Sequence, residues 1–199
     1  KGKEFKMIKI RTMVVGADAN NIDSTSSDDK RITKIGSVCR KIKVDELPQL
    51  FNILIGDMSF VGPRPNVRRE VDIYTKEELK LISIKPGLTD FASIVYSDES
   101  DILTGKGDPN LAYNQLIRPG KSQLGLFYVK NNNLFIDISL IMITLINVFS
   151  RKKSLKLVVK LLKSLKAGYH LVKIASRTEP LYPSPPPGSN IVVQNRNGF

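Results

Sequence analysis

The stretch KIKVDELPQLFNILIGDMSFVGPRP, residues 41–65, joins an acidic pair, an apolar segment and an arginine between two prolines. Asp45 has the side chain of an N-cap residue, Pro48 is compatible with the first turn of a helix, and Gly56 is suited to the end of one. The sequence therefore predicts a helix over this segment. Its apolar face is predicted to be buried and comprises Leu47, Leu50, Phe51 and Leu54.

The acidic pair Asp45 and Glu46 stands at the predicted helix start. A helix N-terminus presents free N–H groups and partial positive charge, which suit a phosphate. Two carboxylates would repel that phosphate unless a divalent cation lay between them, and Mg²⁺ is usually held by one or two carboxylates plus substrate phosphates. The pair therefore predicts a Mg²⁺ site formed by Asp45 and Glu46. The helix start should also keep Asp45 ionised, as a carboxylate nucleophile requires.

Cationic residues near this pair are predicted to bind substrate phosphate. Arg64 lies between two prolines that stiffen its backbone, and a guanidinium holds phosphate oxygens in a two-point contact. Lys9 and Arg11 share one face of a strand predicted over residues 5–13. The predicted phosphate-binding residues are Arg40, Arg64, Lys9 and Arg11. On spacing alone, an N-capping aspartate followed by glutamate is also ordinary helix-start chemistry, so that alternative stays open.

The composition fits one globular core with an appendage, since 41% of the 199 residues are hydrophobic. The single cysteine, Cys39, excludes an internal disulfide. Positive charge is concentrated at the end of the chain, where residues 151–199 hold ten basic residues and one acidic residue. This imbalance indicates an anionic partner surface, either phospholipid or nucleic acid.

Two helices are predicted in the second half of the chain. Residues 134–149 are almost continuously apolar but shorter than the roughly 20 residues that a bilayer span needs, so they form either a core helix or a helix at a membrane boundary. Residues 151–178 are predicted to form one basic amphipathic helix that binds an anionic membrane surface. Residues 179–199 are proline-rich, with little to fold around.

Several motifs together resemble those of the bacterial initiating sugar transferases, the monotopic phosphoglycosyl transferases that load a sugar phosphate onto polyprenyl phosphate. The segment KVDELPQLFNILIGDMSFVGPRP resembles the central signature of that family, and FKMIKIRTM resembles its FxxxKFRTM strand. IKPGLT is similar to its RPGxTG turn, and YVKNNNLFIDISLIMITL to its YVxNxSxxxDxxIxxxT segment. The resemblance covers roughly residues 2–149.

The resemblance implies a catalytic domain over residues 1–150 that transfers a sugar 1-phosphate from a UDP-sugar to undecaprenyl phosphate at the cytoplasmic face of the inner membrane. It implies that Asp45 attacks the donor and carries the phosphosugar, that Glu46 helps to hold Mg²⁺, and that Arg40 and Arg64 handle phosphate. The family's N-terminal re-entrant membrane helix is expected to be missing from this chain.

The chain departs from the family pattern near the predicted substrate pocket. TDFAS, residues 89–93, stands where the pattern reads TGWAQ, and Lys85 stands for an arginine. These departures are expected to affect sugar choice.

A non-catalytic basic module that binds a membrane or nucleic acid is the alternative function, and a metal-dependent phosphohydrolase is a third. A nucleic-acid face would pair cations with exposed aromatic residues, of which the basic end of the chain has few, so no nucleic-acid partner is predicted. The predicted fold is α+β, mostly helical and membrane-associated, with a small antiparallel sheet near the N-terminus.

Overall fold

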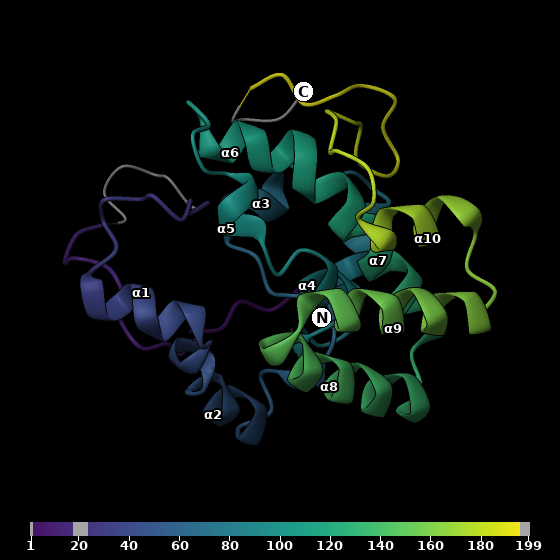
Figure 1. Cartoon of the computed structure of the whole chain (residues 1–199), viewed down its shortest axis with the longest axis horizontal. Helices are drawn as coiled ribbons and strands as arrows, with labels where there is room; N and C mark the ends of the chain where they lie inside the picture. Colours follow the sequence, from purple (N-terminus) through teal and green to yellow (C-terminus); the bar gives the residue numbers. More distant parts are fainter. Residues whose placement is uncertain (1, 18–23, 196–199) are drawn as a thin grey trace.

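The computed structural model describes residues 2–17 and 24–195, and the chain is mostly helical, as predicted (Figure 1). The α-helices are α1 (Lys34–Lys41), α2 (Gln49–Leu54), α3 (Arg68–Asp72), α4 (Phe91–Val95), α5 (Glu99–Ile102), α6 (Pro109–Ala112), α7 (Arg118–Asn131), α8 (Leu134–Phe149), α9 (Arg151–Ser164) and α10 (Tyr169–Ser176). The 3₁₀ helices are η1 (Val44–Glu46) and η2 (Glu78–Ser83), and a π-helical turn, η3 (Tyr113–Ile117), leads into α7.

The sheet is parallel, so the prediction of an antiparallel sheet near the N-terminus is wrong. It consists of β1 (Ser59–Val61) and β2 (Gly87–Thr89), with Ser59 opposite Gly87 and Val61 opposite Thr89. The connection between the strands contains α3 and η2. Parallel strands need such a crossover of a dozen or more residues, whereas a tight hairpin would have made them antiparallel.

The N-terminal segment that was predicted as a strand is not part of a sheet in the described structure, and only Met13 at its end forms an isolated antiparallel bridge, with Ile32. Its backbone is bound instead by the Asn52 side chain, whose Oδ1 accepts from Ile8 N at 3.0 Å and whose Nδ2 donates to Lys6 O at 2.9 Å. Ile10 N donates to Asp45 O at 3.0 Å. These contacts satisfy the backbone groups that a sheet would otherwise pair, and they place the segment beside the acidic pair.

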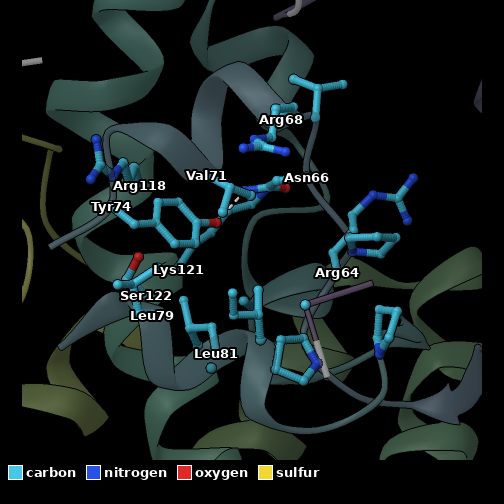
Figure 2. Close-up of a pocket in the computed structure, with 18 of the residues that line it drawn as sticks. Arg64, Asn66, Arg68, Val71, Tyr74, Leu79, Leu81, Arg118, Lys121 and Ser122 are labelled. Atoms are coloured by element: carbon cyan, nitrogen blue, oxygen red, sulfur yellow. Dashed lines mark hydrogen bonds between the residues drawn. The ribbon is translucent and has the colours of Figure 1, made fainter. Parts of the chain in front are cut away.

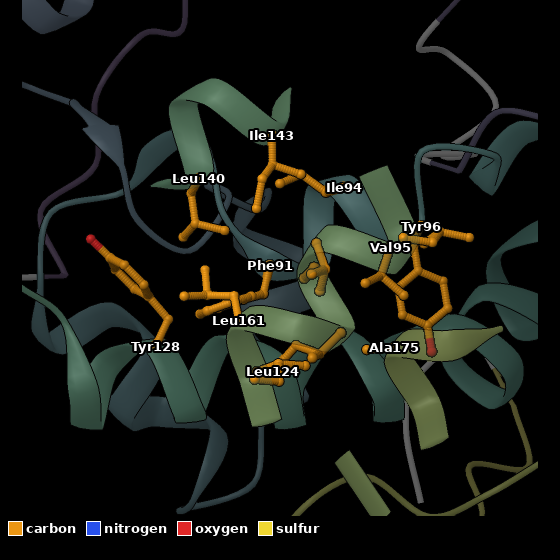
Figure 3. Packing of buried hydrophobic residues seen from close by; sticks show 14 of the residues in the cluster. Phe91, Ile94, Val95, Tyr96, Leu124, Tyr128, Leu140, Ile143, Leu161 and Ala175 are labelled. Atoms are coloured by element: carbon orange, nitrogen blue, oxygen red, sulfur yellow. The ribbon is translucent and has the colours of Figure 1, made fainter. Parts of the chain in front are cut away.

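The hydrophobic core is centred on α4, which packs against α7, α8 and α9 (Figure 3). Phe91 is fully buried and meets Phe127 edge to face, with 5.9 Å between ring centroids. Leu140 of α8 and Leu162 of α9 are also fully buried in this cluster. The core thus fixes the end of β2, from which α4 begins two residues later.

Two glycines bring the VGPRP and KPG segments side by side. A Cβ on Gly87 would lie 2.1 Å from Gly62 N, and a Cβ on Gly62 would lie 2.5 Å from Lys85 O, so larger residues at these positions would separate the two backbones. Gly87 N donates to Pro63 O at 3.1 Å. This close approach fixes the backbone that leads to Arg64.

Helix α2 is oriented opposite to the prediction, because its polar residues point inward. Gln49 and Asn52 are fully buried, and Asn52 holds the N-terminal segment. The apolar residues that were predicted to form a buried face are instead exposed, Leu54 by 80%. They are Leu47, Leu50, Phe51 and Leu54. Alternating patterns predict which residues share a face, but not which face meets the core.

Helix α8, like α2, has polar residues that point inward and apolar residues that are exposed, although part of its apolar surface is buried in the core. Its polar stripe is turned toward the protein, where Tyr128 Oη donates to Asp137 at 2.6 Å, the Thr89 and Thr144 hydroxyls lie 2.6 Å apart, and Ser154 donates to Asn147 at 2.5 Å. Its exposed apolar side chains are Leu134, Phe135, Ile138, Met142, Leu145, Val148 and Phe149. The helix is therefore both a core helix and an exposed apolar surface.

The predicted basic helix over residues 151–178 is two helices, α9 and α10, because Lys166 adopts a left-handed backbone with φ of 56°. The apolar stripe of α9 is buried in the core rather than open to lipid; Val158 and Leu162 are fully buried. The lysines of α9 remain exposed on its opposite face. No helix in the described parts of the chain combines the length and apolarity that a membrane crossing requires.

The proline-rich tail is packed against the protein up to residue 195, contrary to the expectation that it has little to fold around. Gln115 Nε2 donates to Val193 O at 2.8 Å, and Val193 is fully buried. Ser184 N donates to Gln115 O at 3.1 Å, and Thr75 Oγ1 donates to Pro187 O at 2.5 Å. Residues 196–199 lie outside the described part.

Candidate functional site

The acidic pair lies in the 3₁₀ turn η1 and not at the N-cap of α2. The backbone bonds of this segment close three residues back rather than four, which is the 3₁₀ pattern. Leu47 N donates to Val44 O at 3.1 Å, and α2 begins after the proline. Gly56 ends the segment with φ of 87°, as predicted. The 3₁₀ turn and Pro48 thus separate Asp45 from the helix that it was expected to cap.

Asp45 is 8% exposed, and its Oδ1 is buried without a hydrogen-bond partner among the described residues. Burial, and then the charge of Glu46, raise the pKa of the Asp45 carboxyl above its usual range. This direction opposes the expectation that a helix start would favour ionisation. An unpartnered carboxylate oxygen retains the lone pairs that a nucleophile or a cation ligand uses.

Glu46 and Arg64 form an ion pair with two contacts. Arg64 Nη2 lies 2.5 Å from Glu46 Oε1, and Arg64 Nη1 donates to Glu46 Oε2 at 3.2 Å. Although burial opposes it, the guanidinium holds the pKa of the Glu46 carboxyl below its usual range. Without a substrate, the arginine predicted to bind phosphate is therefore neutralised by the neighbour of the predicted nucleophile.

Three further predicted residues differ in how closely they approach the pair. Lys9 and Arg40 both act electrostatically on Asp45, and Arg40 Nε donates to Thr12 Oγ1 at 2.8 Å. Partial burial, and then the charge of Arg64, lower the pKa of the Lys9 ammonium. Arg11 is exposed and makes no hydrogen bond or ion pair with a described residue. The structure thus gathers Lys9, Arg40, Arg64, Asp45 and Glu46, and leaves Arg11 at the margin.

The two carboxylates match the chemistry of a Mg²⁺ site only in part. Across residues 2–17 and 24–195, no group of three or more His, Cys, Asp or Glu side chains is arranged to hold a metal. The unpartnered Asp45 Oδ1 fits a cation ligand, whereas both Glu46 oxygens are occupied by Arg64. Because Mg²⁺ is commonly held by one or two carboxylates together with substrate phosphates, the pair fits a cation that binds with the donor.

Arg64, which pairs with Glu46, also forms part of the wall of a cavity of about 740 Å³ (Figure 2). The other walls come from residues 2–7, α3, η2, α4 and α7. Asp90 lines this cavity, is 1% exposed and caps α4 by accepting from Ser93 N at 2.6 Å. Burial raises the pKa of the Asp90 carboxyl. Asp90 belongs to TDFAS, the segment that departs from the family pattern, but the sequence did not indicate that its side chain is buried.

The cavity also contains tyrosines that the sequence did not single out. Asn66 Nδ2 donates to Tyr74 Oη at 2.6 Å, and Arg118 lies over the Tyr74 ring, 5.3 Å from its centroid. Arg118 is itself held by Glu78 in a buried ion pair of 2.5 Å. These residues lie on separate segments of the chain, and no local motif joins them.

Comparison with known proteins places this site in a family. Residues 1–151 match the family described as bacterial sugar transferase. The "Uncharacterized sugar transferase EpsL" of Bacillus subtilis (strain 168) is 34% identical over 143 residues, covering 72% of this chain and 62% of the relative. The UDP-N-acetylgalactosamine-undecaprenyl-phosphate N-acetylgalactosaminephosphotransferase of Aeromonas hydrophila is 30% identical over 146 residues, covering 72% and 31%.

A third relative is the UDP-glucose:undecaprenyl-phosphate glucose-1-phosphate transferase of Xanthomonas campestris pv. campestris, 33% identical over 157 residues, covering 76% of this chain and 30% of the relative. The chain thus spans less than two thirds of the length of these relatives. The family match nevertheless extends over most of the chain and includes the acidic pair, Arg64 and the start of α9. This protein belongs to the bacterial sugar transferase family.

Proposed function

We propose that this protein transfers a sugar 1-phosphate from a UDP-sugar to undecaprenyl phosphate, through a phosphosugar carried by Asp45. The single observation that carries the proposal is the buried Asp45 Oδ1, which lacks a partner and lies beside a cluster of cations. Relatives named for transfer from UDP-N-acetylgalactosamine and UDP-glucose to undecaprenyl phosphate support the substrate classes. Their names differ in the sugar, so the sugar is left open.

In the first step, Asp45 Oδ1 attacks the sugar-bearing phosphorus of the donor. A new oxygen–phosphorus bond forms, the bond to the UMP oxygen breaks, and UMP leaves with the electron pair. Arg64 exchanges Glu46 for phosphoryl oxygens, while Lys9 and Arg40 offset the growing negative charge. A Mg²⁺ held by Asp45 and the released Glu46 would neutralise charge on the diphosphate.

In the second step, a phosphate oxygen of undecaprenyl phosphate attacks the same phosphorus. The bond to Asp45 breaks, the carboxylate is regenerated, and a polyprenyl diphosphate sugar is released. Partial burial of Asp45 excludes water, which would otherwise hydrolyse the phosphosugar. Transfer to lipid in place of water distinguishes this function from that of a phosphohydrolase.

The acceptor is a lipid, and the exposed apolar helix faces provide a surface for the membrane that contains it. The outer faces of α2 and α8 are apolar while their inner faces carry buried polar groups, an arrangement suited to a lipid environment. In the view of Figure 1, both helices lie along the lower edge of the molecule. Helix α9, which packs against α8, carries exposed lysines that suit an anionic bilayer. We place the protein at the cytoplasmic face of the inner membrane, as a monotopic protein.

Intact-mass analysis tests the covalent step directly. The protein is incubated with Mg²⁺ and a panel of UDP-sugars, without lipid acceptor, and compared with the Asp45→Asn variant, which keeps the shape but removes the nucleophile. We expect a phosphosugar adduct and one equivalent of UMP with the unchanged protein only. An Asp45→Asn protein that transfers sugar phosphate at an undiminished rate would refute the mechanism.

A further inference from the structure

The cavity next to Arg64 is lined by many residues that do not belong to the acidic pair or its cations. Asp45 does not line it, whereas Arg64 both lines it and pairs with Glu46, so Arg64 marks the boundary between the acidic pair and the cavity. Its volume of about 740 Å³ falls within the usual range of ligand pockets, roughly 300–1,000 Å³. One part of the donor can therefore occupy it while the phosphates stay at Arg64.

In phosphoryl transfer, the attacking and leaving oxygens lie roughly in line on opposite sides of the phosphorus. If Asp45 attacks from one side, the leaving UMP lies on the other, beyond the phosphates that Arg64 holds. The sugar, bonded to the reacting phosphorus, projects sideways from that line. The cavity on the far side of Arg64 thus corresponds to the leaving nucleotide.

The polar groups of the cavity form a set that matches one nucleobase. Asn66 donates its amide N–H to the Tyr74 hydroxyl at 2.6 Å, and the Tyr113 hydroxyl lies near the same amide group. A phenol that accepts a hydrogen bond still has its own O–H to donate, and the carbonyl oxygen of the Asn66 amide remains an acceptor. The three side chains together offer two donors and one acceptor.

Uracil presents the complementary set along one edge: two carbonyl oxygens that accept, with an N–H donor between them. Cytosine differs, because it presents an amino donor and a ring nitrogen acceptor at two of these positions. Figure 2 shows the Tyr74 hydroxyl directed toward Asn66, with Arg118 on the other side of the ring. Arg118 over Tyr74, and Lys121 at 5.2 Å from the Tyr113 ring centroid, hold the two rings in place.

We propose that this cavity binds the uridine of the donor, and that Asn66, Tyr74 and Tyr113 read its uracil edge. The assignment rests on the proposed function, which supplies the UDP-sugar as donor. An isoprenoid chain would leave these polar groups unpaired when it displaced water, at a cost in binding free energy. The apolar walls, which include Val71, Leu79 and Leu81, suit the faces of a base.

The test is calorimetric titration of the full chain with UMP, CMP and glucose 1-phosphate. We expect UMP to bind at least about tenfold more tightly than CMP, because mispaired polar groups in an enclosed site are costly. Tyr74→Phe removes one donor and should weaken UMP about threefold to tenfold, with little effect on CMP. Tyr182→Phe, at an exposed tyrosine outside the cavity, is the matched control and should bind UMP as the unchanged protein does.

Asn66→Asp is the second variant, in case loss of the Tyr74 hydroxyl perturbs folding, and circular dichroism checks the fold of each protein. Asn66→Asp replaces the amide, which both accepts and donates hydrogen bonds, by a carboxylate that only accepts. Asn66 is half-buried in a loop, and the change should abolish the preference for UMP over CMP. Equal binding of UMP and CMP, or UMP binding unchanged by both variants, overturns the uridine assignment but leaves the transfer reaction intact. Competition by glucose 1-phosphate that is lost in Tyr74→Phe would assign the cavity to the sugar instead. Failure of the unchanged protein to bind UMP at all would overturn both the assignment and the proposed function.

Discussion

Arg64 and Glu46, 18 residues apart in the sequence, bind each other through the two terminal guanidinium nitrogens and both carboxylate oxygens, with a shortest N–O distance of 2.5 Å. Arg64 was predicted to bind phosphate and Glu46 to help hold Mg²⁺, yet in this structure each neutralises the other. If the donor diphosphate replaced Glu46 as the partner of Arg64, the Glu46 carboxylate would be free to bind a cation. We therefore expect donor binding and Mg²⁺ binding to be coupled, each strengthening the other.

Arg64→Lys is expected to lower kcat/KM about tenfold or more. Lysine keeps the charge but loses the planar two-point contact, and a hydrogen bond to a charged group contributes about 1.5–3 kcal/mol. Initial rates of UMP release with and without lipid acceptor measure the effect. Arg69→Lys, on the exposed surface of α3, is the matched control. Equal losses in the two variants would show that the effect is not specific to the phosphate contact.

The acid limb of kcat/KM is expected to report ionisation of Asp45. Burial and the Glu46 charge raise the Asp45 pKa, so the nucleophile becomes protonated, and activity falls, at a higher pH than an ordinary aspartate would give. Glu46→Gln removes the like charge and should move this limb to lower pH while also reducing the rate and the Mg²⁺ dependence. Rate profiles of the two proteins between pH 4 and pH 8, at saturating Mg²⁺, provide the measurement. A limb that moves to higher pH in Glu46→Gln would contradict the assignment.

Asp90→Asn is expected to stabilise the protein at pH 7 but not at pH 4. Burial outweighs the neighbouring cations and raises the folded-state pKa of Asp90, so the folded protein favours the protonated carboxyl. Stability that depends on this proton is present below the unfolded pKa and is lost as pH rises through the folded pKa. Asparagine keeps the oxygen that accepts from Ser93 N and carries no charge. Thermal unfolding at the two pH values tests this, and an equal change at both would contradict it.

The local chemistry of the site could be predicted from the sequence, but its assembly could not. Gly56 does end the helical segment. The acidic pair does lie close to Arg40, Arg64 and Lys9. Asp45, Glu46 and Arg64 belong to one short signature, which is why their proximity could be predicted. The 3₁₀ turn was not predicted, because Pro48 is compatible with the first turn of an α-helix that Asp45 would have capped. The inward turn of Asn52 was not predicted either, because it depends on which backbone groups of the N-terminal segment remain to be paired.

The apolar periodicity correctly predicted which residues share a helix face, but it led to wrong predictions of whether that face is buried. A stripe of leucines is typical of a core contact in a protein surrounded by water, and the same stripe faces outward when the surroundings are lipid. On α9 the stripe is buried, whereas on α2 it is exposed, although both sequences are amphipathic. The cavity around Tyr74 was not predictable because it joins segments from residue 2 to residue 125.

The double variant Phe135→Ser with Leu145→Ser is expected to weaken binding to vesicles without unfolding the protein. Both side chains are more than half exposed on α8, so their loss removes few internal contacts. Burial of one such side chain in an apolar phase contributes about 1.5–3 kcal/mol, so the double change should greatly reduce association. Flotation with vesicles that contain anionic lipid measures it.

The companion variant Lys156→Gln with Lys160→Gln separates charge from apolar contact. Each lysine near an anionic surface contributes about 1 kcal/mol, and salt screens this contribution. The lysine variant should therefore lose binding chiefly at low salt, while the α8 variant should lose it at every salt concentration. Unchanged flotation of the α8 variant would exclude this helix from the membrane surface.

Val193→Ser is expected to lower the melting temperature, because the proline-rich tail is part of the folded structure. Val193 is fully buried, and its carbonyl accepts from Gln115 Nε2 at 2.8 Å, so serine would lose apolar burial and place a hydroxyl in an apolar site. The expected cost is about 1–3 kcal/mol, which corresponds to several degrees in a chain of this size. Ile191→Ser is the matched control, since Ile191 is 60% exposed, and should have little effect.

The tail is also linked to the cavity. Pro187 O accepts a hydrogen bond from Thr75 Oγ1, and the Thr75 backbone N–H donates to Glu78. Glu78 in turn pairs with Arg118, which lies over the Tyr74 ring. Loosening the tail should therefore weaken UMP binding as well as stability, and a Val193→Ser protein that melts at the normal temperature would show that the tail is dispensable.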